Sequence, residues 1–407
     1  MGVFAGPEIA ESGLVLALDA GNTKGFDDDE NLLTYSEQFN NAAWSKNNYN
    51  VTANATTAPD GTLTADKLIA INASTFHDLY KSPGLGSNTY TLSIFAKVAE
   101  QSFIQLRIDD GAISRLAMFN LSTGSVSSSS NVTSPTITSY PNGWYRCSIT
   151  VTSAIVNVVF NGYPTSSNAT YSGDGVSGVF IWGAQFEYGS VATGYTPTTT
   201  TAKTRGTTWT DLSGNGNTGT LVNGVGYSAS NGGALVFDGV DDNVGCGNDA
   251  SINFGTGDFT VSVWFRRFSN ATGNLRLLSK AAGGDTANAA SAGFSFFGAD
   301  TGISFAVNPT AARTIIGAAS YSLNEWVNVV GLVERGVSMR TYKNASLVAS
   351  TTAPSGSVSG TTSLFIGNNV GSNLHWAGEV SNTLLYNKAL TPQEIQQNFN
   401  ALRSRFQ

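Results

Sequence analysis

Two patterns of hydrophobic and polar positions run through this chain, and each predicts a different kind of β-strand. Near the start, Leu14–Asn22 (LVLALDAGN) is a largely apolar run that ends in a turn, which is typical of a strand buried on both faces. Elsewhere apolar and polar residues alternate with a period of two, as in Trp144–Val151, where every second residue from Tyr145 onwards is apolar. The chain is therefore predicted to be all-β.

Short segments with this alternation recur along most of the chain. Clusters of Gly, Asn, Asp and Ser separate them, and these residues supply turns. Such a density of short strands predicts β-sandwiches or jelly rolls. The clearest predicted strands are Tyr90–Val98, Phe103–Ile108, Trp144–Val151, Val179–Glu187, Phe259–Phe265, Leu277–Lys280, Phe294–Phe297, Ile303–Val307, Trp326–Val333 and Met339–Asn344.

The C-terminal end carries the signals of a short helix. Thr391 as N-cap, Pro392 at the first helical position and Glu394 two residues later form a capping box with a proline start. The helix is predicted to end near Arg403. Apolar residues recur along one side at spacings of four and three, and so form one buried stripe: Ile395, Phe399 and Leu402.

The opening run Leu14–Asn22 has no nearby segment that looks like its pairing partner. After the Thr-rich linker Thr196–Thr204 come Trp209–Thr220 (WTDLSGNGNTGT) and Ala234–Asp242 (ALVFDGVDD). These two motifs resemble the front of laminin-G-like, concanavalin-A-type jelly rolls. In such domains a GLVLxLDA strand lies only a short loop before the Trp-x-Asp-Leu-Ser-Gly-Asn motif, whereas residues 23–208 separate the two here. The resemblance therefore implies one domain interrupted by another.

Five segments mark the two ends of the interrupting region: Asn31–Trp44, Ala58–Thr62, Ala65–Leu68, Trp182–Gly189 and Tyr195–Pro197. They resemble the beginning and the end of carbohydrate-binding-module-like jelly rolls found in phage virion proteins. Related modules often hold a structural calcium ion with an acidic residue just after the Phe of their first strand. Asn40 stands at that place here, so the chain departs from the pattern on which that ion depends.

The predicted fold is two jelly-roll domains, the second inserted into the first, with a short C-terminal helix. Its parts are an N-terminal arm (residues 1–12), a discontinuous concanavalin-A/laminin-G-like jelly roll (residues 13–26 plus 205–407) and an inserted carbohydrate-binding-module-like jelly roll with its linker (residues 27–204). We expect Leu14–Asn22 to lie against strands from the last third of the chain, such as Glu379–Tyr386.

Composition narrows the classes of function. Only 12% of the residues are charged and the formal net charge is −7, so the surface must consist mostly of Ser, Thr, Asn and Gly. No Lys/Arg cluster is available to neutralise phosphates, which argues against nucleic-acid binding. No apolar stretch is long enough to span a membrane, and Met1–Pro7 lacks the features of a secretory signal. Cys147 and Cys246 lie in different predicted domains, which favours buried free thiols.

The sequence offers little for catalysis. His77 and His375 are the two histidines, and neither lies in a nucleophile or metal motif. No Gly-x-Ser-x-Gly elbow, His-Glu-x-x-His or phosphate loop occurs. Concanavalin-A-type glucanases carry a Glu-x-Asp-x-x-Glu strand with carboxylates on one face, and this chain lacks such a run. We therefore expect a protein that is not an enzyme.

Binding chemistry has two sets of candidates. Carbohydrate binding needs exposed aromatic platforms, for which the candidates are Trp44, Trp144, Tyr145 and Trp376, although core packing is the alternative for each. A calcium ion, the one candidate cofactor, needs clustered oxygen ligands. Asp238, Asp241 and Asp242 offer three carboxylates around a glycine, the alternative being that Asp238 caps the turn and the other two are solvated.

The resemblances together imply a structural protein on the exterior of a tailed-phage virion, such as a capsid decoration, head fibre or appendage. Its expected partners are other virion proteins of the capsid or tail and a host-surface glycan, and analogy with exterior phage proteins suggests a homotrimer. A tail-fibre or baseplate receptor-binding protein is an alternative. A secreted or surface lectin and a polysaccharide-degrading enzyme are further alternatives, which the missing signal and the missing carboxylate strand disfavour. Residues 1–10 are a candidate docking arm.

Overall fold

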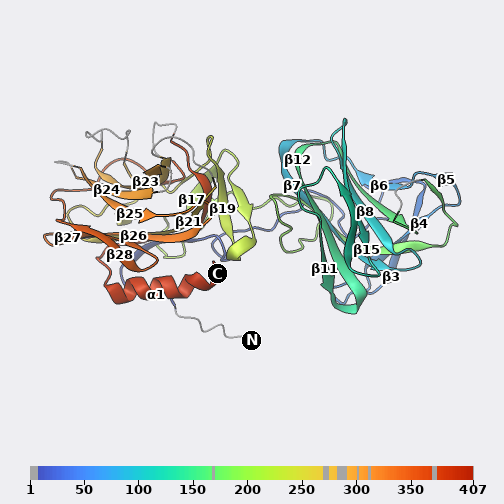
Figure 1. The fold of residues 1–407 in the computed structure, drawn as a ribbon, viewed down its shortest axis with the longest axis horizontal. Coiled ribbons are helices and arrows are strands. Elements are labelled where there is room, and N and C mark those ends of the chain that lie inside the picture. The colour runs from blue at the N-terminus through green and yellow to red at the C-terminus, as the bar shows by residue number, and fades with distance from the viewer. Residues whose placement is uncertain are drawn as a thin grey trace. The chain divides into compact units, whose positions relative to one another are not determined.

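The computed structural model describes residues 8–166, 170–268, 275–281, 291–299, 302–309, 313–368 and 374–406. The chain forms two compact units, shown in Figure 1. We call Met1–Asp27 with Gly206–Gln407 the discontinuous unit, and Asp28–Arg205 the inserted unit. Both consist mainly of β-strands, and α1 (Pro392–Leu402) is the one α-helix in the described ranges. The all-β prediction with a short C-terminal helix is confirmed.

The discontinuous unit contains two antiparallel sheets. The first has the order β18 (Gly226–Ser228), β19 (Ala234–Asp238), β30 (Ala377–Tyr386), β21 (Phe259–Arg267), β26 (Trp326–Glu334), β27 (Ser338–Lys343) and β28 (Ser346–Thr351), and β1 (Leu14–Asp19) also pairs with β30. The second has the order β16 (Thr208–Trp209), β17 (Gly219–Val222), β20 (Asn243–Gly245), β29 (Phe365–Ile366), β22 (Leu275–Ser279), β23 (Gly293–Ala299), β24 (Gly302–Asn308) and β25 (Thr314–Ser320). One apolar cluster draws buried side chains from both sheets.

Strand β1 pairs with the strand that the sequence indicated. It runs antiparallel to β30, with Leu14 opposite Tyr386 and Asp19 opposite Asn382. Strand β19 pairs with the other half of the same strand, from Val380 to Ala377. Because β21 covers the opposite edge of β30 along its length, β1 and β19 together complete the hydrogen bonding of this central strand. The expected contact of Leu14–Asn22 with Glu379–Tyr386 is confirmed.

The second edge of β1 is occupied by the motif that resumes the domain after the insertion. The backbone N–H of Ala17 donates to the Asp211 carboxylate at 2.9 Å, and the amide nitrogen of Asn217 donates to the Val15 carbonyl at 2.8 Å. The N–H of Leu212 donates to the Ala17 carbonyl. The motif around Asp211 thus takes the place of a neighbouring strand, which explains why the two segments resemble parts of one domain.

The chain leaves and re-enters the discontinuous unit at neighbouring points. The N–H of Gly206 donates to the carbonyl of Asp27 at 2.8 Å, and within the inserted unit Asn31 and Lys203 form an antiparallel bridge. The two unit boundaries each lie one residue from the boundaries predicted at 26/27 and 204/205.

Helix α1 begins as the sequence predicts. The Thr391 side chain accepts from the N–H of Glu394, whose carboxylate accepts from the N–H of Thr391. Its buried face includes Ile395 and Leu402, while Phe399 is half-buried and stacks on Trp264 with ring centroids 5.4 Å apart. The polar residue Asn398 is also buried on this face, where it donates to the Tyr386 hydroxyl.

Part of the predicted N-terminal arm contacts this helix. The N–H of Ala10 donates to the Asn398 side chain at 2.7 Å, and Gln397 donates to the carbonyl of Glu8. Residues 1–7 lie outside the described residues. The docking function of the arm stays a prediction.

The inserted unit also contains two six-stranded antiparallel sheets. One has the order β10 (Ser125–Ser130), β9 (Ser114–Asn120), β8 (Phe103–Asp109), β13 (Asn157–Tyr163), β6 (Asp78–Lys81) and β2 (Ser45–Asn47). The other has the order β11 (Thr136–Tyr140), β12 (Trp144–Ile155), β7 (Leu85–Val98), β15 (Gly178–Tyr188), β4 (Ala65–Ala70) and β3 (Tyr49–Thr56). A small additional sheet pairs β14 (Tyr171–Ser172) with β5 (Ser74–Thr75).

Short 3₁₀ turns occur in both units. One lies at Pro141–Gly143 in the inserted unit, and three lie in the discontinuous unit, at Ser230–Gly232, Ala250–Ile252 and Arg403–Arg405.

The alternation along β12 sorts its side chains between two environments. Cys147, Ile149 and Val151 point into the apolar core between the sheets. Arg146 and Ser148 therefore lie on the opposite face of the same strand. Part of that outer face is buried, because a second apolar cluster, including Phe95, Trp144 and Trp182, covers it.

Both cysteines are buried free thiols, as predicted. Burial raises the pKa of the Cys246 thiol to about 12, and it raises that of Cys147 further. Neither thiol is therefore a nucleophile near neutral pH. Among the described residues, no helix has the length and hydrophobicity needed to cross a membrane.

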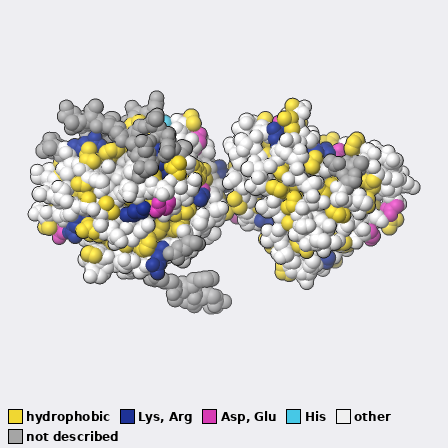
Figure 2. Space-filling model, viewed as in Figure 1, with side chains coloured by type: hydrophobic (Ala, Val, Ile, Leu, Met, Phe, Trp, Pro, Cys, Tyr) yellow, Lys and Arg dark blue, Asp and Glu magenta, His cyan; other side chains and the backbone are white. Residues whose placement is uncertain are grey.

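The surface matches the low charge of the sequence. Figure 2 shows a face made mostly of uncharged polar side chains and backbone, on which basic and acidic side chains are few and scattered. Apolar side chains are dispersed among them on this face.

Candidate functional site

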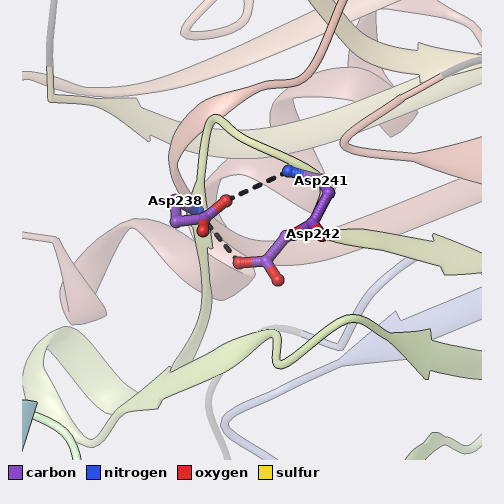
Figure 3. A group of neighbouring side chains, drawn as sticks. All are labelled: Asp238, Asp241 and Asp242. Carbon is purple, nitrogen blue, oxygen red and sulfur yellow. Dashed lines mark hydrogen bonds between the residues drawn. The ribbon is translucent and has the colours of Figure 1, made fainter. Parts of the chain in front are cut away.

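The three residues of the predicted acidic cluster lie close together in the discontinuous unit (Figure 3). Asp238 ends β19 in the first sheet, and Asp241 and Asp242 lie in the loop that leads to β20 in the second sheet. Each residue offers a carboxylate oxygen, and these oxygens all lie within 4.8 Å of one another. Asp238 and Asp241 are exposed, whereas Asp242 is buried. The loop therefore gathers three acidic groups at the edge of the jelly roll.

Hydrogen bonds within the loop fix this arrangement. One oxygen of Asp238 accepts from the N–H of Val240 at 2.8 Å and from that of Asp241 at 3.4 Å, and Asp242 accepts from the N–H of Asp238 at 3.0 Å. Gly239 has φ +80°, and a Cβ there would lie 2.7 Å from that of Ala377. Asp238 therefore caps the turn, as the alternative interpretation predicts, and Asp241 is solvated, but Asp242 is buried.

The capping hydrogen bonds do not neutralise the charge of Asp238. Asp238 and Asp241 form no ion pair with any residue that the structure describes. Three carboxylates this close repel each other, and a divalent cation would relieve the repulsion. Clustered carboxylate oxygens are ligands that calcium prefers, although calcium takes six to eight oxygens. The donor set fits the ion, with the remaining ligands to come from backbone carbonyls or water.

Core packing, the alternative to a carbohydrate platform, holds for three of the four candidate aromatic residues. Trp44, Trp144 and Trp376 are at most 1% exposed. The indole N–H of Trp44 donates to the Tyr35 carbonyl at 2.9 Å, and that of Trp144 donates to the Thr57 carbonyl at 3.1 Å. A ring without exposed surface cannot stack on a sugar, so these three residues are core residues in this structure.

Tyr145, the fourth candidate, is half-buried against the core of the inserted unit. Its ring lies so close to Gly124 that a Cβ at that position would be 2.6 Å from a ring carbon. Packing thus fixes Tyr145 at the rim of the core, on the face of β12 opposite to Arg146.

Asn40, the residue that departs from the calcium pattern of the resembled modules, lines a small polar pocket. It encloses about 280 Å³ and is lined by Glu37, Gln38, Asn40, Ala53, Asn54, Thr64 and Asp66. The buried Asp66 carboxylate accepts from the N–H groups of Phe39 and Asn54. This carboxylate therefore links the two backbone segments that contain Phe39 and Asn54. The pocket gives no further support for a metal site.

A larger groove, which the sequence did not indicate, lies on the outer face of the second sheet of the inserted unit. It encloses about 410 Å³ and is lined by Ser134, Thr136, Thr138, Tyr140, Arg146, Ser148, Thr150, Ser190, Val191 and Ala192. Strands β11 and β12 form its floor, joined by the tight turn at Pro141–Gly143. The segment after β15 forms its wall, held by a hydrogen bond from Thr150 to the Ser190 carbonyl at 3.1 Å.

Arg146 is the one charged residue among those that line the groove. It is 9% exposed, its guanidinium lies 5.4 Å from the centre of the Phe95 ring, and it donates to the Thr193 carbonyl and the Ser93 hydroxyl. Its Nε has no hydrogen-bond partner among the described residues. Burial lowers the pKa of Arg146 from its usual value, although Glu187 and Tyr140 act in the opposite direction. The guanidinium nevertheless stays charged.

Glu187 lies beneath the groove wall and is nearly inaccessible. It accepts from the Gln185 amide at 2.8 Å and from the Thr193 hydroxyl at 2.6 Å. Burial raises the pKa of Glu187 to about 7, against the effect of these donors and of Arg146. In the described residues the Glu187 carboxylate is not within ion-pair distance of Arg146, so it compensates that charge only in part.

Raising the pH from 5 to 8 is expected to destabilise the inserted unit. Between the ordinary pKa of 4.5 and the folded value of about 7, the folded chain holds a proton on Glu187 that the unfolded chain has lost. Stability therefore falls as the pH rises through this window, by at most ~3 kcal/mol. The Glu187→Gln variant, neutral at every pH, should show a flatter dependence in thermal unfolding. Equal slopes for both proteins would contradict this assignment.

The two histidines do not form a site with these groups. The His77 ring packs against Tyr49 and Tyr171, with ring centroids 5.5 and 4.6 Å away. His375 precedes the buried Trp376 and β30. The geometry gives His77 a packing role.

Alternation could have revealed the groove. The alternation in Trp144–Val151 that predicts its apolar face also places Arg146, Ser148 and Thr150 together on the other face. A charged residue between two hydroxyls on a predicted strand is the signal that was available. The wall formed by residues 190–192 could not be inferred from any local pattern.

Comparison with known proteins supports the fold of the discontinuous unit. Residues 238–396 match the model of the concanavalin A-like lectin/glucanases superfamily, of the laminin G type. The matching stretch begins at the acidic loop. No curated protein matches the sequence.

Among solved structures, the binding domain of Paraclostridial Mosquitocidal Protein 1 is 18% identical, with a TM-score of 0.41 over 47% of this chain and 49% of that chain. The binding domain of botulinum neurotoxin serotype G is 14% identical, with a TM-score of 0.39 over 47% of each chain. The receptor-binding domain of botulinum neurotoxin D gives 14% and 0.39, over 47% of this chain and 49% of that chain. The chain thus spans about half the length of these proteins.

Proposed function

We propose that this is a non-catalytic glycan-binding protein whose discontinuous unit recognises a carbohydrate, with a calcium ion held by Asp238, Asp241 and Asp242. The observation that carries this proposal is the position of the acidic loop at the start of the stretch that matches a lectin and glucanase superfamily. The loop joins the two sheets at the edge of the jelly roll. Calcium there would hold the loop and offer open coordination positions to sugar hydroxyls.

The state of the carboxylates favours binding over hydrolysis. Glycoside hydrolysis uses two carboxyl groups about 5–10 Å apart on either side of the scissile bond. Glu379 and Glu187, two of the seven buried acidic residues in the described ranges, are engaged by other groups: Glu379 pairs with Arg266 at 2.7 Å, and Glu187 accepts from Gln185 and Thr193. The sequence also lacks the Glu-x-Asp-x-x-Glu run of the related glucanases. A reducing-sugar release assay would test this part of the proposal.

Removal of calcium is expected to abolish glycan binding by the discontinuous unit. On a glycan array, addition of EDTA or the double variant Asp238→Asn/Asp241→Asn should reduce the signal at least tenfold. At a hundredfold excess over its Kd, calcium should also stabilise the wild type by about 3 kcal/mol. Asp249→Asn is a matched control, because Asp249 is an exposed aspartate that caps a 3₁₀ turn elsewhere in the unit. Binding that is indifferent to EDTA would overturn the calcium role.

We further propose that the protein lies on the exterior of a tailed-phage particle, where it contacts other virion proteins and presents these jelly rolls to host glycans. The resemblance of Asn31–Trp44 and Trp182–Gly189 to modules of phage virion proteins supports this location, as does a surface poor in charge. Mass spectrometry and immunogold imaging of purified particles would test it. Absence of the protein from intact particles would overturn the proposed location and leave the binding chemistry open.

The candidate docking arm has its own test in the same particles. Because Ala10 bonds to helix α1, a deletion of residues 1–7 removes the part of the arm outside the described residues and leaves this contact intact. Loss of the protein from particles after this deletion would support a docking role. Normal incorporation of the shortened protein into particles would contradict a docking role.

A further inference from the structure

We infer that the groove of the inserted unit is a second binding site, and that it takes an acidic sugar whose anionic group is held by Arg146. This site lies in a different unit from the acidic loop and has the opposite charge. Neither site depends on the other.

The first argument is the charge of the groove. Arg146 carries a buried positive charge, and the acceptors of its two hydrogen bonds, the Thr193 carbonyl and the Ser93 hydroxyl, are both neutral. Among the residues that the structure describes, no carboxylate lies within ion-pair distance of Arg146. A buried charge without a paired counter-charge is unfavourable. An anion entering the groove from solvent would supply the missing partner.

The second argument is the number of donors that remain. A guanidinium carries five N–H groups arranged as a planar fork. The two hydrogen bonds named above use one Nη each. Nε has no acceptor in the described part of the chain but is itself buried, so the donors left for an anion in the groove are the remaining Nη hydrogens. The stacking of Arg146 on Phe95 holds the fork in one plane. A carboxylate or sulfate oxygen pair matches this geometry better than a neutral hydroxyl does.

The third argument is the rest of the lining, which suits a sugar ring. Tyr140 at the mouth is 38% exposed, and its ring meets Phe95 edge-on with centroids 4.9 Å apart. This contact fixes the orientation of Tyr140, whose exposed ring can stack on the apolar face of a pyranose. Hydroxyl groups of the two floor strands line the groove together with Arg146: those of Thr136, Thr138, Ser148 and Thr150. Each hydroxyl oxygen can accept a hydrogen bond from a sugar hydroxyl, although Thr136 bonds to Ser148 and Thr150 donates to the Ser190 carbonyl. A volume near 410 Å³ falls within the range of small-ligand sites.

The register of β11 against β12 provides a sharp test. Thr138 pairs directly with Arg146, is exposed and lines the groove. A Thr138→Glu substitution would place a carboxylate beside the guanidinium and occupy it. The neighbouring Ser139 is also exposed, but it pairs with Tyr145 and does not line the groove. Ser139→Glu therefore adds the same charge to the same edge strand, away from the site.

The experiment measures binding of matched acidic and neutral oligosaccharides by the full chain: trigalacturonate against trigalactose, 3′-sialyllactose against lactose, and a sulfated against an unsulfated disaccharide. We expect the wild type to bind at least one acidic member at least tenfold more tightly than its neutral counterpart, and to bind it less tightly in high salt. Thr138→Glu should lose this binding at least tenfold, and Ser139→Glu should stay within twofold. The three pairs distinguish uronate, sialate and sulfate as the source of the anion.

Three results would overturn the inference: equal affinity for acidic and neutral members, no binding to any acidic member, or unchanged acidic binding in Thr138→Glu. Thermal unfolding of both variants checks that each still folds. Repeating the binding measurement in EDTA distinguishes binding at the acidic loop from binding in the groove. Binding that is lost in EDTA but kept in Thr138→Glu would support the acidic loop and reject the groove. The reverse result would support the groove and reject the calcium role.

Discussion

A chain in which a short Gly/Ser loop replaces residues 28–205 is expected to fold, whereas a chain that lacks residues 13–20 is expected not to form the discontinuous unit. The excision should be tolerated because Asp27 and Gly206 are already hydrogen-bonded to each other, so a short loop spans the cut. The deletion removes β1, which pairs with β30 from Leu14–Tyr386 to Asp19–Asn382.

The size of the second effect follows from what β1 buries. Leu16 and Leu18 are both fully buried in the main core cluster, and loss of each such side chain costs about 2–5 kcal/mol. The deletion also leaves half of one edge of the central strand β30 without a partner, and it removes the N–H that Asp211 accepts from. Together these losses reach the 5–15 kcal/mol that typically stabilises a whole domain.

Circular dichroism, cooperative thermal unfolding and a dispersed amide NMR spectrum would distinguish the outcomes. The excised chain should show all three signs of a folded domain, and the same chain also lacking residues 13–20 should show none of them. Deletion of residues 1–7 from the excised chain is a control of similar length that leaves β1 intact. A cooperative transition in the chain without β1 would show that the interrupted-domain interpretation is wrong.

The parts of the fold that the sequence predicted share one property, which is that their signals are local or stereotyped. The capping box at Thr391 is a pattern of four residues. The pairing of Leu14–Asp19 with β30 is long-range, but the motif Trp209–Thr220 identified the missing neighbour of that strand. The inward face of β12 followed from simple alternation.

The features that the sequence does not determine are surfaces, because the exposure of a surface depends on which segments cover it. Trp144 lies on the outer face of β12, where a tryptophan would be exposed if nothing lay above it. The Thr57 carbonyl and the cluster with Phe95 and Trp182 cover it instead. The groove beside it has the segment at residues 190–192 as one wall. Neither the cover nor its edge has a signature in the local sequence.

The roles of two aspartates also differ from what their sequence contexts indicate. The acidic cluster makes Asp238 a candidate metal ligand, whereas the sequence indicates Asp211 only as part of a motif. In the structure Asp211 is 8% exposed and accepts from the N–H groups of Ala17, Ser213 and Asn217 and from the Ser213 hydroxyl. Asp238 is exposed, and it accepts from two N–H groups of exposed loop residues. Burial, which the sequence does not show, separates the two.

The Asp211→Ala variant is therefore expected to lose about 3–5 kcal/mol of the free energy of unfolding of the discontinuous unit. Removal of the Asp211 carboxylate leaves the buried N–H groups of Ala17 and Asn217 without an acceptor. Each buried N–H group without an acceptor costs about 1–3 kcal/mol. Asp238→Ala, measured in EDTA, should lose no more than about 1 kcal/mol, because water can replace its carboxylate at exposed groups.

Chemical denaturation of the excised chain would measure both free energies, and the comparison tests a link between two segments that lie almost 200 residues apart. In Asp211→Ala the amide of Ala17 should also exchange its hydrogen faster than the neighbouring amides of β1, because that amide loses its acceptor while the pairing with β30 remains. An equal loss of stability in the two variants, or unchanged protection of Ala17, would show that Asp211 merely caps its own turn. The two halves of the domain would then be held together by the apolar contacts of β1 alone.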